Sequence, residues 1–226
     1  MMKDVFSVAA MVGFALSLPI LGAACCAWGA EPEPSGKPEV SEIDRLRDEF
    51  IRDFPRIGLN TAPGDAKFLE LIVEISGAKS GVEVGAATGY GAIHMGRAFE
   101  RNGGKLVTID IDPEMVKATR ENLAKVRLHE TVEVIEGDAL EVLPKLEGQY
   151  DFVFIDAVKR DYLKYFRTIE PRLRPGAVIV ADNVIRSADA MRDFFEAIEQ
   201  DPRYEMTTLR TSELKGDGMA LIRKRR

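Results

Sequence analysis

The 226-residue chain is 46% hydrophobic and 30% charged, the composition of an ordinary globular protein with room for one large domain. Its formal net charge of −6 gives no reason to expect nucleic acid or another polyanion as a partner. The basic run RKRR at the C-terminus follows an apolar strand pattern. We therefore interpret this run as a solvated tail.

Residues 1–30 differ in character from the rest of the chain. They carry no charge after the first four positions, are rich in Ala, Leu and Val, and end in small residues. With Lys3 before the apolar run, this pattern predicts a secretory signal peptide, cleaved after Gly29 with Ala27 at position −3. An uncleaved membrane anchor and a buried helix are the alternatives, although Pro19 weakens the anchor.

A cleaved signal predicts a secreted or periplasmic protein, whereas an anchor predicts contact with a membrane. Cys25 and Cys26 are the only cysteines and both lie in this segment. A lipid-modified cysteine is therefore a further alternative, and the cleaved protein would have no thiol. Residues 31–40 contain three prolines and are predicted to form an extended linker. The folded domain is then expected over residues 41–226.

This domain is predicted to begin with two helices. The first covers residues 41–54 with Ser41 as its N-cap, and the second covers residues 61–76. Each has four apolar residues at helical spacing that predict one buried face: Ile43, Leu46, Phe50 and Phe54 in the first, and Phe68, Leu69, Ile72 and Ile75 in the second.

From residue 81 onward, strands and helices alternate. Strands are predicted at 81–85, 105–110, 131–137, 150–156 and 177–182, with a helix after each, beginning near Gly89, Pro113, Asp138, Asp161 and Ser187. Residues 204–210 and 218–224 have no helix between them and predict an antiparallel hairpin. Five strand–helix units predict an α/β fold with a doubly wound, mostly parallel sheet and the hairpin at one edge.

Polar side chains follow two of these apolar strands. Asp156 ends the strand 150–156, Lys159 comes three residues later, and Asp182 and Asn183 end the next strand. Ligands of open α/β sheets bind beyond the carboxyl ends of the strands, so we expect these side chains in one crevice. Carboxylate and amide oxygens suit Mg²⁺ or Mn²⁺ better than zinc. The plain alternative for each residue is a helix cap or a turn at the end of a strand.

A glycine-rich turn, VEVGAATGYG, follows the first strand and opens a helix. Gly85 and Gly89 would let the backbone approach a ligand closely, although a tight turn alone also needs glycine. The spacing G-x-x-x-G-x-G is not the dinucleotide pattern, and Glu83 would repel a pyrophosphate. Asp110, at the end of the second strand, is predicted to bind a ribose diol. A positively charged sulfonium cofactor, S-adenosylmethionine, fits this acidic rim better than NAD.

Asp112 is predicted to be the N-cap of the helix that begins at Pro113. Asp138 closes the third strand and has two open interpretations, either a contact to a base or a helix cap.

Five blocks, GDAK, VEVGAATGYG, TIDIDPE, DFVFIDAVK and ADNVI, cover nearly all of residues 41–226 in this order. In these blocks the chain resembles the Mg²⁺-dependent O-methyltransferases, the group that contains catechol O-methyltransferase and caffeoyl-CoA O-methyltransferase. The resemblance implies a Rossmann-like class I methyltransferase fold with a seven-stranded sheet. It also implies S-adenosylmethionine and Mg²⁺ or Mn²⁺ as cofactors, a small aromatic vicinal diphenol as acceptor, and a homodimer.

The resemblance also implies roles for individual residues. It implies a metal site of Asp156, Asp182 and Asn183, with Lys159 as the general base. It implies a cofactor site with the ribose on Asp110, the adenine near Asp138 and Ala139, and the methionine end and sulfonium near Glu83, Gly85, Tyr90, Gly91 and Asp156.

Two positions depart from the catechol enzyme's pattern. Val158 stands where that enzyme has a tryptophan wall, and the segment DGMALIRK lacks the acid that helps hold a catechol hydroxyl. Both lie on the acceptor side, so the resemblance leaves the acceptor open. The alternatives are a nicotinamide-linked oxidoreductase on a related sheet and a non-catalytic binding protein that has kept the fold. An exported enzyme would also need its methyl donor in a compartment where the donor is not made.

Overall fold

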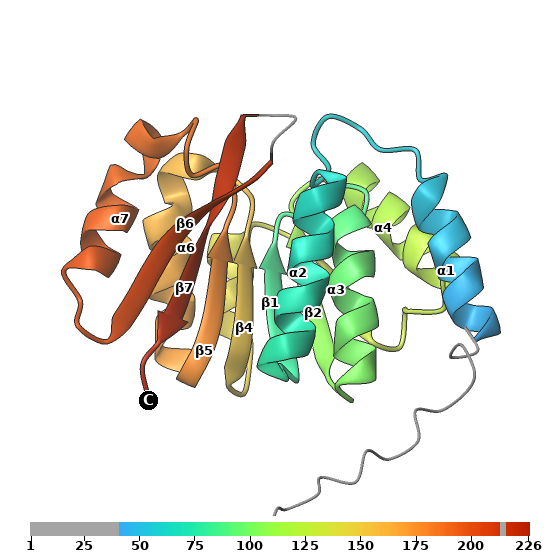
Figure 1. The fold of residues 1–226 in the computed structure, drawn as a ribbon, viewed down its shortest axis with the longest axis horizontal. Helices are drawn as coiled ribbons and strands as arrows, with labels where there is room; N and C mark the ends of the chain where they lie inside the picture. The colour runs from blue at the N-terminus through green and yellow to red at the C-terminus, as the bar shows by residue number, and fades with distance from the viewer. Residues whose placement is uncertain (1–40, 213–215) are drawn as a thin grey trace, which may run out of the picture. The chain divides into compact units, whose positions relative to one another are not determined.

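The computed structural model describes residues 41–212 and 216–226. In this part of the chain a seven-stranded sheet of order β3-β2-β1-β4-β5-β7-β6 lies between two layers of helices (Figure 1). The first five strands are parallel to one another, and β7 is the antiparallel strand, because it pairs antiparallel with both β5 and β6. Their bounds are β1 Ser80–Val84, β2 Lys105–Asp110, β3 Val132–Glu136, β4 Tyr150–Ile155, β5 Leu173–Ala181, β6 Tyr204–Ser212 and β7 Asp217–Lys224.

This topology confirms the predicted doubly wound sheet and its closing hairpin. The hairpin adds a detail that the sequence pattern does not contain, because β7 pairs with β5 and leaves β6 as the outer strand. The predicted signal peptide or anchor and the linker lie outside the described residues. Among the helices of the described part, none has the length and apolar character needed to cross a membrane.

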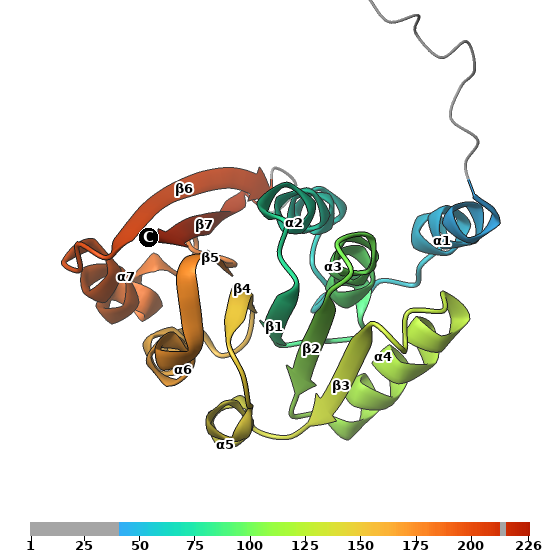
Figure 2. The ribbon, with the colours of Figure 1, turned by 90° about the horizontal axis from the view of Figure 1, so that it is seen from below.

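Helices cover both faces of the sheet (Figure 2). One layer contains α2, α3 and α4, and the other contains α5, α6 and α7, while α1 packs beside α3 and α4 (Figures 1 and 2). The bounds are α1 Glu42–Arg52, α2 Pro63–Ser76, α3 Tyr90–Arg101, α4 Pro113–Lys125, α5 Ala139–Val142, α6 Tyr162–Ile169 and α7 Arg192–Glu199. Two helices predicted as continuous, near 138–146 and 187–199, each combine a short α-helix with a 3₁₀ turn.

The strands are buried on both faces, which explains why their sequences are continuously apolar. Alternate residues of β4 enter different cores: Phe152 and Phe154 pack in the core with α2, α3 and α4, whereas Val153 and Ile155 pack in the core with α5, α6 and α7. All four are fully buried. This double burial fixes the register of β4, because a shift by one residue would exchange the two sets.

Local signals at the helix ends agree with the structure. The Ser41 side chain accepts a hydrogen bond from the Asp44 backbone N–H at 3.1 Å, and Asp112 accepts one from the Glu114 N–H at 2.8 Å. Both caps were predicted.

The predicted burial of Ile75 is wrong, because this side chain is 78% exposed. The buried stripe of α2 runs through Leu69 and Val73, and a residue two positions after Val73 points to the opposite side of the helix.

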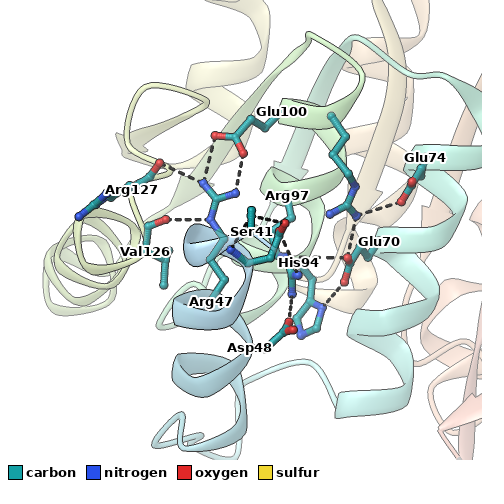
Figure 3. A network of polar contacts seen from close by, with 12 residues as sticks. Ser41, Arg47, Asp48, Glu70, Glu74, His94, Arg97, Glu100, Val126 and Arg127 are labelled. Carbon is teal, nitrogen blue, oxygen red and sulfur yellow. Dashed lines mark hydrogen bonds and ion pairs between the residues drawn. The ribbon is translucent and has the colours of Figure 1, made fainter. Parts of the chain in front are cut away.

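Buried polar residues hold α1 and α2 against α3 (Figure 3). Arg47 of α1 is 3% exposed and donates to Glu100 of α3 and to the Val126 carbonyl. Glu70 of α2 is 1% exposed and contacts His94 Nδ1 at 2.9 Å and Arg101 Nη2 at 2.7 Å, both on α3. These contacts fix the helices from which the loop beside the functional cleft extends.

Candidate active site

A cleft of about 820 Å³ lies at the carboxyl ends of the parallel strands. The ends of β1, β2, β4 and β5 all contribute to its wall, together with Met115 of α4, Ala139 of α5 and Tyr165 of α6. Its lining contains most residues predicted for the site: Gly85, Asp110, Asp138, Ala139, Asp156, Lys159, Asp182 and Asn183. The structure therefore brings the predicted metal-binding, cofactor-binding and catalytic groups into one cavity.

Strand pairing places the two carboxylates of the predicted metal site next to each other. Ile155 of β4 pairs with Ala181 of β5, so Asp156 and Asp182 are the next residues along two neighbouring strands. The Asp182 N–H donates to the Ile155 carbonyl at 3.0 Å, which extends the pairing to the end of the strand. Asn183 then turns the chain with a left-handed φ of 59°, a conformation that asparagine tolerates better than most residues.

The electrostatics of this corner favour a bound cation. Burial, together with the neighbouring charge of Asp156, raises the pKa of Asp182 to about 8. A divalent cation between the two carboxylates would offset both effects, because it would add positive charge next to both of them. Among the described residues, no cluster of three or more His, Cys, Asp or Glu side chains can hold a metal. The donor set that fits is two carboxylates and the Asn183 amide, all of them hard oxygen ligands.

Lys159 lies beside this donor set. Its Nζ is 2.7 Å from Asp156 Oδ1 and 2.9 Å from the Tyr162 hydroxyl. The Tyr162 hydroxyl donates in turn to the Asp182 backbone carbonyl at 3.1 Å. Burial holds the pKa of Tyr162 well above its ordinary value, so the phenol remains protonated. Tyr162 thus links the amine to the end of β5, a role that the sequence pattern did not indicate.

The glycine-rich turn approaches β4 so closely that one position takes only glycine. Gly85 has a φ of 97°, and a Cβ there would lie 2.2 Å from the Asp156 carbonyl oxygen. The turn is also anchored to β2, because Asp110 Oδ2 accepts hydrogen bonds from the backbone N–H groups of Ala86 and Ala87 at 3.0 and 2.8 Å. The predicted helix after the turn begins at Tyr90, with Gly89 as its N-cap.

Asp110 and Asp138 both line the cleft and both have structural partners. Asp110 Oδ1 accepts from the Asp112 N–H, so this carboxylate organises the turn as well as facing the cavity. Asp138 is the N-cap of α5 and accepts from the Leu140 N–H at 2.8 Å. The cap interpretation of Asp138 is therefore confirmed, and its place in the lining leaves the predicted contact to a base as a prediction.

Glu83, Tyr90 and Gly91 are buried and do not belong to the lining of the cavity. Burial raises the pKa of Glu83 to about 8, against the lowering effect of a hydrogen bond from Thr108. A Cβ on Gly91 would lie 3.0 Å from Glu83 Oε1, so the carboxyl sits directly beneath the first turn of α3. Tyr90 packs between Phe54 and His94. The predicted contacts of these three residues with a cofactor remain predictions.

The sequence analysis missed parts of the cavity that come from loops. Gly58 and Leu59, from the loop between α1 and α2, line it, and Leu59 is 70% exposed. The loop is tied to the glycine-rich turn, because the Thr88 hydroxyl donates to Asn60 Oδ1 at 3.0 Å. Arg186 also lines the cavity. In the sequence the available signal was an apolar residue, Leu59, between two predicted helices, and this points to no particular site by itself.

The two positions at which the sequence departs from the catechol enzyme's pattern have different surroundings. Val158 lines the cleft and is 47% exposed, so a small apolar side chain forms this part of the wall. The segment DGMALIRK does contain one acid, Asp217, but this residue is 4% exposed and outside the lining, so the predicted lack of an acid that contacts the acceptor stays a prediction.

Comparison with known proteins gives consistent results. A family model described as O-methyltransferase matches residues 35–225. A catechol O-methyltransferase of Mycobacterium tuberculosis is 35% identical over 182 residues, covering 75% of this chain and 81% of that protein. A catechol O-methyltransferase of Niastella koreensis is 36% identical over 137 residues, covering 59% of this chain and 62% of that protein. The crystal structure of an O-methyltransferase from Bacillus cereus in complex with SAH superimposes with a TM-score of 0.71 at 30% identity, covering 83% of this chain and 92% of that one.

The doubly wound sheet and the acidic cleft at its strand ends define a Rossmann-like α/β enzyme of the methyltransferase class. The chain belongs to the O-methyltransferase family, and its resemblance to the cation-dependent members is confirmed. It is an S-adenosylmethionine-dependent O-methyltransferase by this membership. The alternative of a nicotinamide-linked oxidoreductase is therefore set aside.

Proposed function

We propose that this enzyme transfers the methyl group of S-adenosylmethionine to one hydroxyl of a small aromatic vicinal diphenol, with a divalent cation held by Asp156, Asp182 and Asn183. One observation carries the proposal: these three oxygen donors and Lys159 line the same cavity as Asp110, the predicted ribose ligand. The names of the catechol O-methyltransferases among the relatives support a diphenol as the acceptor.

The proposal assigns donor binding to one end of the cleft and cation binding to the other. At the end of the cleft beside β2 and β3, Asp110 and Asp138 would hold the adenosine part of the donor. At the β4–β5 end, the two carboxylates and the Asn183 amide would hold the cation, which would supply positive charge that favours ionisation of a bound hydroxyl. A diphenol with two adjacent oxygens fits such a site better than a monophenol, because it offers two oxygen ligands.

Lys159 is the group placed to take the hydroxyl proton. Its Nζ lies 2.7 Å from a carboxylate oxygen of the metal site, within reach of a hydroxyl bound at the same site. The neutral amine accepts the proton, the phenolic oxygen forms a bond to the methyl carbon, and the bond from this carbon to sulfur breaks. The products are a methyl ether and S-adenosylhomocysteine. Positioning of the two reactants supplies much of the acceleration.

Methyl transfer from labelled S-adenosylmethionine to catechol tests the proposal, with phenol as the matched acceptor that lacks the second oxygen. We expect transfer to catechol alone, its loss when a chelator removes the metal, and its recovery with Mg²⁺ or Mn²⁺. Asp182→Ala should abolish the recovery. Equal transfer before and after metal removal contradicts the proposed role of the metal.

For residues 1–30 we propose an export signal, with a membrane anchor as the alternative. The support is the pattern of an apolar stretch followed by small residues. N-terminal sequencing of the protein from its native cell distinguishes the two. A mature chain that begins at Ala30 supports the signal, whereas an intact N-terminus supports the anchor.

A further inference from the structure

Asp217, the first residue of β7, holds the turn that carries the proposed metal ligands. It is 4% exposed, and its Oδ1 accepts three backbone hydrogen bonds, from Ile185 at 3.0 Å, Arg186 at 3.1 Å and Gly218 at 2.9 Å. The first two donors belong to the segment directly after Asn183. One carboxylate oxygen thus fixes the path of the chain beyond β5.

The other oxygen of the same carboxylate faces the Asn183 side chain. Asn183 Nδ2 lies 3.4 Å from Asp217 Oδ2. A side-chain amide has one end that donates and one end that accepts, whereas an ionised carboxylate can only accept. The carboxylate therefore selects the NH₂ end of Asn183 and leaves its carbonyl oxygen turned away from Asp217. Only this oxygen end can bind a hard divalent cation.

The backbone around the pair leaves little freedom for another arrangement. The Val184 N–H donates to the Gly218 carbonyl at 3.0 Å, so β7 holds the turn from two neighbouring residues. A Cβ at Gly218 would lie 2.2 Å from the Leu209 carbonyl oxygen, which restricts this position to glycine. Asp217 and Gly218 are thus locked between β6 and the turn that follows β5.

We propose that Asp217 is a positioning residue that fixes the orientation of the Asn183 amide, so that its oxygen rather than its nitrogen faces the bound cation. The inference rests on the proposed metal site. It assigns the acid of the DGMALIRK segment to the support of a metal ligand and not to contact with the acceptor.

The substitution Asp217→Asn tests this orientation with little change in shape. Asn at 217 can still accept the three backbone N–H groups with its oxygen, but its NH₂ group then faces Asn183 and attracts the amide oxygen. The Asn183 NH₂ is thereby turned toward the metal site. We expect the affinity of the donor-free protein for Mn²⁺, measured by electron paramagnetic resonance, to fall by about 10- to 100-fold. The affinity for S-adenosylmethionine and the thermal midpoint should stay close to wild type.

The double variant Asn183→Asp with Asp217→Asn, the exchanged pair, tests whether metal binding can be restored. The Asn side chain at 217 then donates to the carboxylate at 183, which presents an oxygen to the cation whichever way it turns. The net charge is that of the wild type. We expect Mn²⁺ affinity to return to within a few-fold of wild type. Asp151→Asn is the matched control, because Asp151 also accepts two backbone N–H groups, from Lys79 and Ser80, at the opposite ends of the strands.

The possible outcomes separate this inference from the proposed function. Equal Mn²⁺ affinities of wild type and Asp217→Asn overturn the orienting role while the metal site stands. An Asp217→Asn protein that fails to fold, or an exchanged pair that does not restore binding, assigns Asp217 to the fold alone and also overturns it. A wild-type protein that binds no Mn²⁺ overturns the inference together with the proposed metal requirement.

Discussion

At the scale of single residues, two positions in the cleft, Lys159 and Gly85, have close neighbours that predict what a substitution would do. Lys159 contacts one carboxylate and one phenol, and its side chain is only 25% exposed. A Cβ at Gly85 would collide with the backbone carbonyl of Asp156, the residue directly after β4. Changes at these two positions should therefore have large effects of different kinds, one on the rate of methyl transfer and one on stability.

Lys159→Met should lower kcat by about 10²- to 10⁴-fold, because it removes the proposed proton acceptor. Binding of S-adenosylmethionine should change little, since Lys159 lies at the β4–β5 end of the cleft. Steady-state kinetics and calorimetric titration of the donor measure the two quantities. Lys164→Met is the matched control, because Lys164 lies on α6, is 66% exposed and pairs only with Asp161 among the contacts described. Equal kcat for both variants contradicts the role of Lys159.

Gly85→Ala should destabilise the protein much more than Gly148→Ala. Both glycines have positive φ, at 97° and 83°, but only the Cβ at position 85 meets another atom, the Asp156 carbonyl oxygen at 2.2 Å. Strain alone, as at Gly148, costs about 1 kcal/mol. Urea titration at neutral pH measures both free energies of unfolding. Similar values for the two variants would show that backbone strain and not the contact with Asp156 dominates.

At the scale of helices, a buried ionic network holds α2 against α3. Glu70 of α2 is hydrogen-bonded to His94 and Arg101 and forms an ion pair with Lys67. Burial opposes its ionisation, but the bonds from His94 and Arg101 outweigh burial and hold its pKa far below the ordinary value. The ionised carboxyl thus stabilises the folded state at every pH above the ordinary glutamate pKa of 4.5, and this contribution is lost as the pH falls below that value.

Glu70→Gln should lower the free energy of unfolding at pH 7 by about 3 kcal/mol, because a neutral amide replaces the buried carboxylate that is hydrogen-bonded to both His94 and Arg101. The difference from wild type should shrink as the pH is lowered below 4.5, since the wild type alone then loses the contribution of ionised Glu70. Urea titrations between pH 3 and pH 8 measure this trend.

Glu74→Gln is the matched control for Glu70→Gln. Glu74 is on the same helix and contacts the same Arg101, but its side chain is 45% exposed, so its effect should stay below about 1 kcal/mol. A difference between wild type and Glu70→Gln that does not change with pH would show that the charge of Glu70 is not the cause.

At the scale of the whole molecule, the order of the strands creates the cleft. Between β1 and β4 the connections diverge, because β1 continues into α3 on one face of the sheet and β4 continues into α6 on the other (Figure 2). Such a switch point leaves a crevice at the carboxyl ends of the two strands. The glycine-rich turn and the metal ligands lie on its two sides, which brings a donor and an acceptor together.

A chain that begins at Ser41 should keep its stability and its affinity for S-adenosylmethionine. The described residues, 41–212 and 216–226, already supply two hydrophobic clusters and the lining of the cleft. Thermal unfolding and titration of the donor, compared with the full chain, measure this. A thermal midpoint lower by more than a few degrees, or weaker donor binding, would show that residues 1–40 contribute to the folded domain.

The sequence by itself determined the local structure and the chemistry of the strand ends. The positions of the strands, the caps at Ser41 and Asp112, the glycine-rich turn and the group of Asp156, Lys159, Asp182 and Asn183 were all predicted. Each is encoded within a short stretch, by apolar periodicity, by a capping side chain or by a polar residue directly after a strand. Ile75 was the exception, because apolar spacing shows that a helix has a face but not which part of the face is covered.

Only the tertiary structure decided the contacts between distant segments. Asp217 reaches Asn183 across 34 residues, and Asn60 reaches Thr88 across 28. The insertion of β7 between β5 and β6 creates the first contact, and the packing of the loop before α2 creates the second. Neither follows from local periodicity, because the position of a strand in a sheet depends on the free energy of the whole packed core and not on the residues of that strand alone.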